Sequence, residues 1–361
     1  MKKTLAAAGL AALAASAANA GGFERSGVPL GFMFEKGGYA ELSYGSVSPS
    51  VKGAAGGGLA PTGNVTPSYS QIGLAVKADL NEKLSFGVTI DPSYGADISY
   101  PAPSPGPAPY PIRGTNAELN GQTVAAVARY KFNENFSVHA GLRQVSVGGN
   151  VQIFNGGVPL YQANFSKDSD LGYLVGVAYE KPEIALRVAL TYQSETKHVL
   201  KTTVFGGPVP SALYPRVELP KSVTLDFQSG VAANTLVFGS IRWVDWTSAT
   251  LNAPGYPLNP LISHANDTIT YNLGVGRKFN DNWSAAVSLG YEKSNGGIAS
   301  NLSPTDGYAS IQVGATYTHE NMKISAGVRY VDIGNAVSLG GASQFRNNSA
   351  TAIGLRVGFS F

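Results

Sequence analysis

Six arginines lie in stretches where small or polar residues alternate with larger apolar ones, each opposite the apolar set. They are Arg129, Arg143, Arg187, Arg242, Arg329 and Arg356. A guanidinium group can hold a carboxylate through two parallel hydrogen bonds, so any of them could bind an acidic head group. The commoner role is pairing with Asp or Glu on a neighbouring strand, and Arg242 with Asp226 is the pair we expect.

The residue types give little support for a catalytic function. The four histidines are His139, His198, His264 and His319, and no two of them lie at the spacing of metal ligands. A lipase built on a Ser–His pair would need a histidine at the outer surface, whereas His139 is predicted to point inward. We therefore predict no enzyme activity, no catalytic residue, no metal site and no cofactor.

Composition narrows the protein class. The chain of 361 residues has no cysteine, only 14% charged residues, 44 glycines, 18 tyrosines and 15 phenylalanines. A soluble domain usually carries about 25% charged residues. The net charge of +3 is too small to indicate nucleic acid as a partner. No stretch beyond residue 20 holds the roughly 20 apolar residues that a spanning helix needs. A closed β-barrel is the other structure that satisfies every backbone hydrogen bond in lipid.

The first twenty residues have the pattern of a secretory signal peptide. Lys2 and Lys3 precede an apolar stretch, and Ala18-Asn19-Ala20 is typical of a cleavage site. We therefore expect residues 1–20 to be removed and the mature chain to begin near Gly21.

Alternation with a period of two recurs along the rest of the chain. From Trp283 to Glu292, odd positions are mostly large and apolar while even ones are small or polar, and the last eleven residues repeat the pattern. In a membrane barrel the apolar set faces lipid and the polar set lines the lumen. A soluble β-sandwich would instead have to bury all the aromatic residues of these runs.

A short turn unit rich in Asn, Asp and Lys fixes the strand count. It appears at 77–86, 131–137 and 278–284, with looser versions at 180–183, 231–234 and 319–322. Asn and Asp suit tight hairpins. Six hairpins give twelve strands, and the runs Tyr39–Ser48 and Thr351–Phe361 bring the number to fourteen. The prediction is an all-β, transmembrane antiparallel barrel over 39–361, with both termini in the periplasm.

Seven longer connections alternate with the short turns, at 49–66, 95–120, 150–167, 197–218, 251–265, 294–306 and 334–349. We expect them to face outward from the cell. Two of them are unusually apolar, which indicates a binding surface at the mouth or loops that pack on each other. Their apolar residues are Phe205, Leu213, Tyr214, Tyr256, Leu258, Leu261 and Ile262.

Residues 21–38, called the plug segment below, precede the first strand and read GGFERSGVPLGFMFEKGG. Fourteen strands enclose a lumen too wide for inward side chains to fill. An apolar segment could enter this lumen and touch an apolar ligand; a free tail is the alternative. The residues expected to plug the barrel or contact ligand are Val28, Leu30, Phe32, Met33 and Phe34.

The run LPKSVTLDFQSGVAANTLVFGSIRWVDWT, from Leu219 to Thr247, resembles the central hairpin of the FadL-type outer-membrane transporters of hydrophobic compounds. The resemblance implies a monomeric barrel with an N-terminal hatch that passes long-chain fatty acids or related molecules inward by passive diffusion. Two features differ from better-known members. The plug segment is short and lacks an Asn-Pro-Ala motif, and the connection 150–167 is short.

Three functions follow as hypotheses: a plugged channel for hydrophobic compounds, a general or sugar-type porin, and an adhesive barrel that acts through its loops. For the first, the expected partners are fatty acids or detergents, outer-membrane lipid and lipopolysaccharide, and the barrel-assembly machinery. The expected location is the bacterial outer membrane. Pro92 next to Asp91 could mark a kinked strand that opens the wall sideways.

Overall fold

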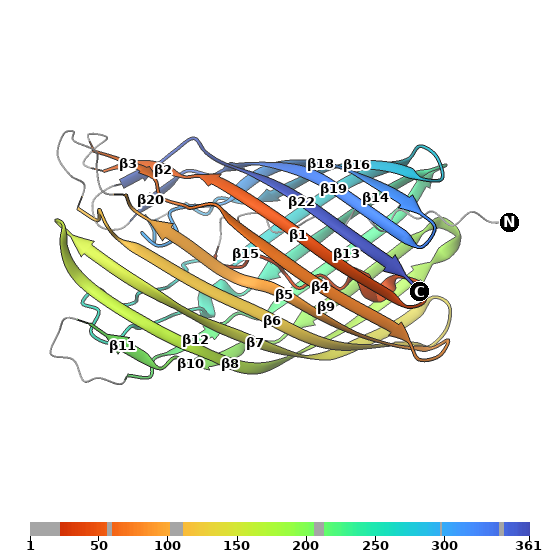
Figure 1. The fold of residues 1–361 in the computed structure, drawn as a ribbon, viewed down its shortest axis with the longest axis horizontal. Coiled ribbons are helices and arrows are strands. Elements are labelled where there is room, and N and C mark those ends of the chain that lie inside the picture. Colours follow the sequence, from red (N-terminus) through yellow and green to blue (C-terminus); the bar gives the residue numbers. More distant parts are fainter. Residues whose placement is uncertain (1–21, 56–59, 102–110, 206–212, 297, 339–342) are drawn as a thin grey trace.

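The computed structural model describes residues 22–55, 60–101, 111–205, 213–296, 298–338 and 343–361. Residues 1–20, predicted as a signal peptide, lie outside the described residues. The described chain forms an antiparallel barrel with tilted strands (Figure 1). Its main sheet has fifteen strands, of which β11 (Thr202–Val204) is a short extension beside β8; the other fourteen close through the pairing of β8 with β9.

The fourteen wall strands are β1 (Tyr39–Ser50), β4 (Tyr69–Asp79), β5 (Leu84–Ser99), β6 (Asn116–Lys131), β7 (Phe136–Asn155), β8 (Val158–Lys181), β9 (Leu186–Gln193), β13 (Ser222–Ala232), β14 (Thr235–Val244), β15 (Thr268–Lys278), β16 (Trp283–Glu292), β18 (Tyr308–His319), β19 (Met322–Ile333) and β22 (Asn348–Ser360). The predicted fold class and strand number are confirmed.

Large apolar residues cover the outer face of the barrel wall. On β16, Val287, Leu289 and Tyr291 are 45%, 59% and 51% exposed, whereas Ser284 and Glu292 are buried. This inversion of a soluble core is the arrangement that lipid requires. No helix in the described ranges is long and apolar enough to cross a membrane.

The six predicted hairpins all form, and they lie at one end of the barrel, called the short-turn end below. Three of them share one device: the side-chain oxygen of Asn81, Asn133 or Asn280 accepts the backbone N–H groups two and three residues later, at 2.8–3.0 Å. Such Asn turns explain why the sequence unit recurs.

The opposite, long-loop end differs in part from the sequence prediction. Residues 150–167, predicted as a loop, belong to β7 and β8, which meet in a tight turn at Gly156 and Gly157. Strands also extend into the predicted loop 95–120. The reason is tertiary: inward residues such as Val151, Tyr161 and Phe165 pack into an apolar cluster at this end and so continue the alternation.

Short strands cover the long-loop end. β10 (Thr196–Val199) pairs with β12 (Arg216–Leu219). A second small sheet has the order β17 (Ile298–Ala299), β20 (Ala336–Ser338), β21 (Ser343–Phe345), β2 (Lys52–Ala55) and β3 (Ala60–Asn64). Within the described ranges the 3-10 helices are η1 (Gly31–Phe34), η3 (Pro182–Ile184) and η4 (Trp246–Ser248).

The wall is interrupted between β4 and β5. These strands pair from Leu74 with Ile90 to the short turn, but Tyr69–Gly73 of β4 have no described partner on β5. The register of β5 against β6 shifts between Asp91 and Tyr94, where Pro92 removes a backbone donor. We call this stretch, from Asp91 to Ile98 of β5, the wall break. The kink expected near Asp91 and Pro92 is therefore present.

Candidate functional site

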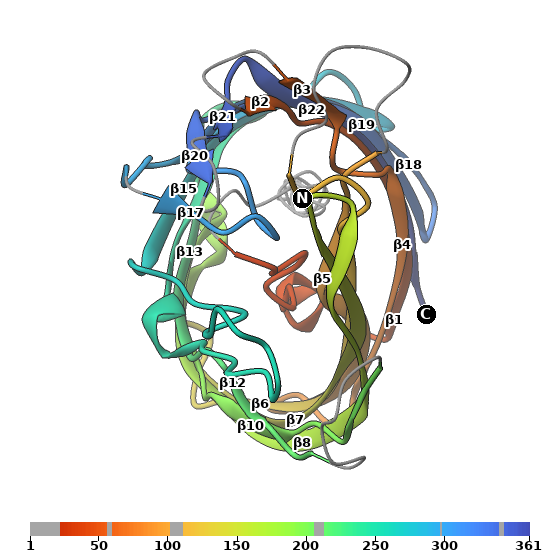
Figure 2. The ribbon, with the colours of Figure 1, turned by 90° about the vertical axis from the view of Figure 1, so that its left-hand side faces the viewer.

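The plug segment, described from Gly22, runs inside the barrel (Figure 2). Val28, Phe32 and Met33 are 3%, 2% and 1% exposed and pack against the inner wall. Gly87 of β5 permits this contact, since a Cβ there would lie 2.6 Å from Met33 Sδ. Leu30, also expected to belong to the plug, is only partly buried against the same cluster.

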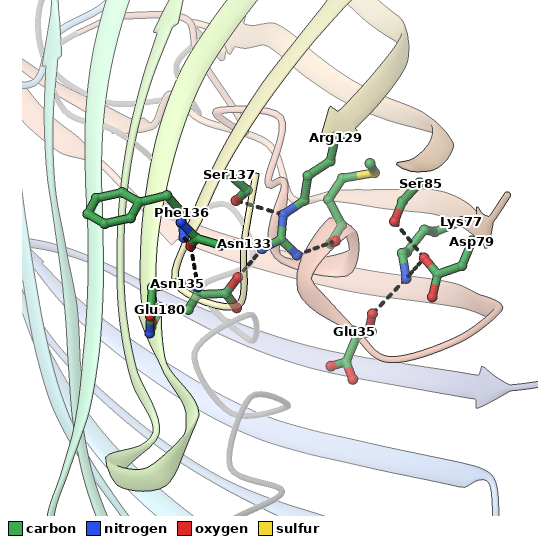
Figure 3. Close-up of polar contacts among 11 residues, drawn as sticks. Glu35, Lys77, Asp79, Ser85, Arg129, Asn133, Asn135, Phe136, Ser137 and Glu180 are labelled. Carbon is green, nitrogen blue, oxygen red and sulfur yellow. Dashed lines mark hydrogen bonds and ion pairs between the residues drawn. The ribbon is translucent and has the colours of Figure 1, made fainter. Parts of the chain in front are cut away.

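Cations hold the end of the plug segment nearest the short turns (Figure 3). Lys77 Nζ donates to the carbonyl oxygens of Glu35 and Gly37 at 2.7 and 2.8 Å. Lys323 Nζ lies 2.7 Å from Glu35 Oε2. Together these bonds tie the segment to β4 and β19 just before β1 begins.

The ring of Phe34 lies between two guanidinium groups. Arg129 Cζ is 4.2 Å and Arg187 Cζ 4.6 Å from the ring centre, both within cation–π range. Arg129 also donates to the carbonyl of Met33 at 3.3 Å and pairs with Glu180. Arg129 and Arg187, two of the lumenal arginines, thus both contact Phe34 of the protein's own plug segment.

The other end of the plug segment is bound to β14 through Arg242, and to β5 through contacts described below. Arg242 donates from Nε and Nη2 to the two carboxylate oxygens of Glu24, at 3.0 and 2.6 Å. The expected partner Asp226 is not the acid that forms this ion pair. Sequence could not reveal the difference, because Glu24 approaches β14 only once the plug segment enters the barrel.

The wall break is filled from inside by the plug segment. Backbone N–H groups of Arg25 and Ser26 donate to the Ser93 carbonyl at 2.8 and 3.2 Å, and Gly95 N–H donates to Phe23 O at 2.8 Å. The plug segment therefore takes the edge of β5 that β4 has left free. This pairing satisfies backbone groups that would otherwise be unpaired.

The Arg25 side chain spans the wall break. Its Nη2 lies 2.5 Å from Asp97 Oδ2 on β5, and its Cζ lies 4.0 Å from the ring centre of Tyr69 on β4. Gly95 leaves the space for it, since a Cβ there would lie 2.5 Å from Arg25 Cζ. A small cavity lined by Arg25, Tyr69, Asp97 and Ile98 lies at this point.

An apolar cavity lies on the long-loop side of the plug segment. It has about 890 Å³ of space between its atoms, part of it open to solvent. Most of its lining is aliphatic and aromatic, and the polar residues at its border are Glu118, Asn150, Ser263, His264, Ser300 and Ser303. The principal lining residues are Phe23, Ala117, Leu119, Val147, Val151, Phe165, Leu200, Leu219, Leu251, Leu261 and Ile262.

Phe23 connects this cavity to the plug segment. Its ring meets Trp246 edge-on at 4.9 Å between centroids, and His264 lies 5.0 Å from Trp246. Burial lowers the pKa of His264 to about 4, so this histidine is neutral at pH 7. A molecule in the apolar cavity would therefore touch the residue next to Glu24 and Arg25.

The remaining lumenal arginines all lie inside the barrel. Arg143 donates to the Ser194 carbonyl, Arg329 donates to Ser310 Oγ at 2.9 Å, and Arg356 Nε lies 3.8 Å from Glu41 Oε2. Arg329 and Arg242 line a second, polar cavity on the β13–β19 side of the plug segment. The structure thus distributes the six arginines over the lumen rather than gathering them in one site.

The predicted mouth residues divide into two groups. Leu261 and Ile262 line the apolar cavity, and Tyr256 packs against Tyr161 with 5.3 Å between ring centres. Phe205, Tyr214 and Leu258 are 50%, 59% and 68% exposed, while Leu213 is half-buried and bonded to Thr202. Only the first group belongs to the apolar cluster that also contains Phe23 of the plug segment.

Five residues of this site were not predicted from the sequence: Phe23, Glu24, Arg25, Asp97 and Trp246. The Phe-Glu-Arg triplet at 23–25 is a signal that could have indicated three of them, because it places two charged residues beside an aromatic one in a segment expected to enter the lumen. Asp97 lay in a predicted loop. Among the described residues, no three His, Asp or Glu side chains gather closely enough to hold a metal ion.

Comparison with known proteins agrees with this geometry. Residues 40–352 match the family described as outer membrane protein transport protein (OMPP1/FadL/TodX). No protein of curated function matches the chain.

Among solved structures, a Pseudomonas aeruginosa FadL homologue has a TM-score of 0.72 at 14% identity and covers 92% of each chain. The Ralstonia pickettii toluene transporter TbuX has a TM-score of 0.64 at 14% identity, covering 94% of this chain and 95% of its own. The P. putida toluene transporter TodX has 0.66 at 13%, covering 91% of each. These likenesses show the fold, and the match over 40–352 shows that the chain belongs to the OMPP1/FadL/TodX family of outer-membrane transport proteins.

Proposed function

We propose that this protein passes hydrophobic small molecules, with long-chain fatty acids as the first candidates, inward across the outer membrane by passive diffusion. The long-loop end faces outside and both termini lie in the periplasm. The observation that carries the proposal is the contact between the apolar cavity and the plug segment through Phe23. A ligand there acts on the same short stretch that occupies the wall break.

The path has three parts in this proposal. A molecule first enters the apolar cavity from the long-loop end, driven by the removal of its apolar surface from water. It then displaces Phe23 and with it Glu24 and Arg25. Finally it leaves sideways through the wall break into lipid, since the way toward the short-turn end is occupied by Phe34 between Arg129 and Arg187.

Monoaromatic hydrocarbons are the second candidate ligands. The solved toluene transporters share the fold, and the rings of Phe23, Trp246 and His264 offer aromatic contacts at the cavity. A general or sugar-type porin is not favoured, because the plug segment occupies the lumen and the cavity above it is apolar.

Uptake by cells tests the proposal. Cells that lack the protein should take up radiolabelled long-chain fatty acid or toluene more slowly, and the cloned gene should restore the rate. The same uptake with and without the protein, across both substrate classes, would contradict it. In planar bilayers the wild-type barrel should show little conductance, whereas a porin would conduct steadily.

A further inference from the structure

The start of the wall break carries a buried acid that neither the barrel nor the apolar path requires. Asp91 is 8% exposed and is the first residue of β5 beyond the last pair with β4. Four residues with hydroxyl side chains lie near Asp91 or near its neighbours on the strand: Ser26, Ser43, Ser93 and Thr123.

The carboxyl group lies over the inner face of β4. Gly73 stands opposite it, and a Cβ on Gly73 would lie 3.8 Å from Asp91 Oδ2 and 2.7 Å from Ser43 Oγ. On the other side, Ser93 Oγ and Thr123 Oγ1 form a hydrogen bond with each other at 2.5 Å. The space above Gly73 is thus shared by the Ser43 hydroxyl group and the Asp91 carboxyl group.

Asp91 is incompletely paired. Its Oδ1 is buried without a hydrogen-bond partner, and no ion pair joins it to a cation within the described ranges. The side chain that does serve it as a hydrogen-bond partner is Ser26 of the plug segment. Buried acceptors without donors are costly, so such a group is usually kept for a purpose.

We propose that Asp91 is a polar subsite of the transport path that accepts a hydrogen bond from the uncharged hydroxyl head group of an amphiphilic substrate, and that Ser26 takes the place of that hydroxyl when the plug segment is closed. This inference rests on the proposed function and specifies its substrates. The head group replaces Ser26 as the plug segment moves, while the apolar part lies toward the cavity or the lipid.

Charge decides which head groups fit. Among the described residues Asp91 has no cation partner, and Glu24, although paired with Arg242, adds a second negative charge nearby, so this subsite would repel an ionised carboxylate. An alcohol, a phenol or the neutral form of a fatty acid each offers an O–H donor that can replace the Ser26 hydroxyl at the carboxylate. A fatty acid would therefore occupy this subsite in its neutral form.

Binding of two matched ligands to the full-length barrel in amphipols tests the subsite. The probes are 4-hexylphenol and hexylbenzene, which differ by one hydroxyl group. The wild type should bind the phenol about tenfold more tightly, as a hydrogen bond to a charged acceptor implies. Asp91→Leu should abolish this preference and leave hexylbenzene binding unchanged.

Two further variants separate a subsite from a merely structural acid. Ser26→Ala removes the competing hydroxyl and should increase the preference for the phenol. Thr89→Val, a buried inward position two residues earlier on β5, is the control and should leave the preference unchanged. An undiminished preference in Asp91→Leu, or an equal loss for both ligands, would overturn the subsite while the transport proposal stood. Failure of the wild type to bind hexylbenzene would count against both.

Discussion

Arg25 Nη2 lies 2.5 Å from Asp97 Oδ2, and this ion pair joins the plug segment to β5 at the place where β5 leaves β4. The same guanidinium covers the ring of Tyr69 on β4 at 4.0 Å. One side chain from the plug segment therefore links two strands that do not pair with each other there. This position makes Arg25 the group most directly placed to hold the wall break closed.

Arg25→Ala should loosen the wall break. Loss of a hydrogen bond between charged groups should shift the balance between closed and open forms about tenfold toward open. Cells carrying the variant should accumulate a hydrophobic dye faster than wild type. Lys36→Ala, an exposed position on the same segment, is the matched control. Unchanged dye entry in Arg25→Ala would show that the wall break is closed by other contacts.

Glu24→Gln should free the end of the plug segment nearest the long loops. Breaking one partner of a buried ion pair costs about 3–5 kcal/mol because the remaining charge is left unpaired. Hydrogen exchange at the amides of Arg25 and Ser26, which bond to Ser93 O, should become faster. Glu35→Gln breaks the pair with Lys323 at the opposite end and should leave these two amides protected. Equal exchange in both variants would mean that the segment moves as one unit.

Ala117→Trp should fill part of the apolar cavity. Ala117 of β6 lines the cavity, so the larger ring would occupy space that a ligand needs. Uptake of hydrophobic substrate should fall while the amount of folded barrel, seen as heat-modifiable mobility on gels, stays the same. Ala128→Trp, an exposed position on the same strand, should leave uptake unchanged. If Ala117→Trp took up substrate at the wild-type rate, the apolar cavity would not be part of the transport path.

His264 should make the loop cluster at the long-loop end sensitive to acid. Its pKa is about 4 when folded, against about 6.5 in an unfolded loop. Above pH 6.5 both states are neutral and stability is unaffected. Between these values only the unfolded state takes up the proton, so stability falls with falling pH, by up to about 3 kcal/mol at pH 4.

Tryptophan fluorescence across this range measures the effect, since Trp246 packs against His264. The wild type should show a transition below pH 6.5 that His264→Leu lacks. His319→Leu, at an exposed turn, should keep the transition. A transition that survives in His264→Leu would assign it to another group.

Much of the fold was readable from local pattern. Alternation on runs such as Trp283–Glu292 determined which residues face lipid, because side chains of a strand point to opposite faces in turn. The turn unit around Asn81, Asn133 and Asn280 determined the hairpins, because each Asn caps its own turn within three residues. Strand number and fold class follow from these local facts.

The residues of the candidate site are brought together by contacts between positions that are distant in sequence. Arg242 and Glu24 are separated by 218 positions and Arg25 and Asp97 by 72, so no spacing rule pairs them. The sequence placed a weak signal at Asp91 and Pro92, but a proline near a strand end does not reveal what fills the resulting space. Only when the barrel closes does the plug segment find the free edge of β5, because that edge exists only after β4 and β5 have separated. Local pattern thus determined the barrel and its inner and outer faces, and tertiary structure alone decided how the plug segment meets the wall.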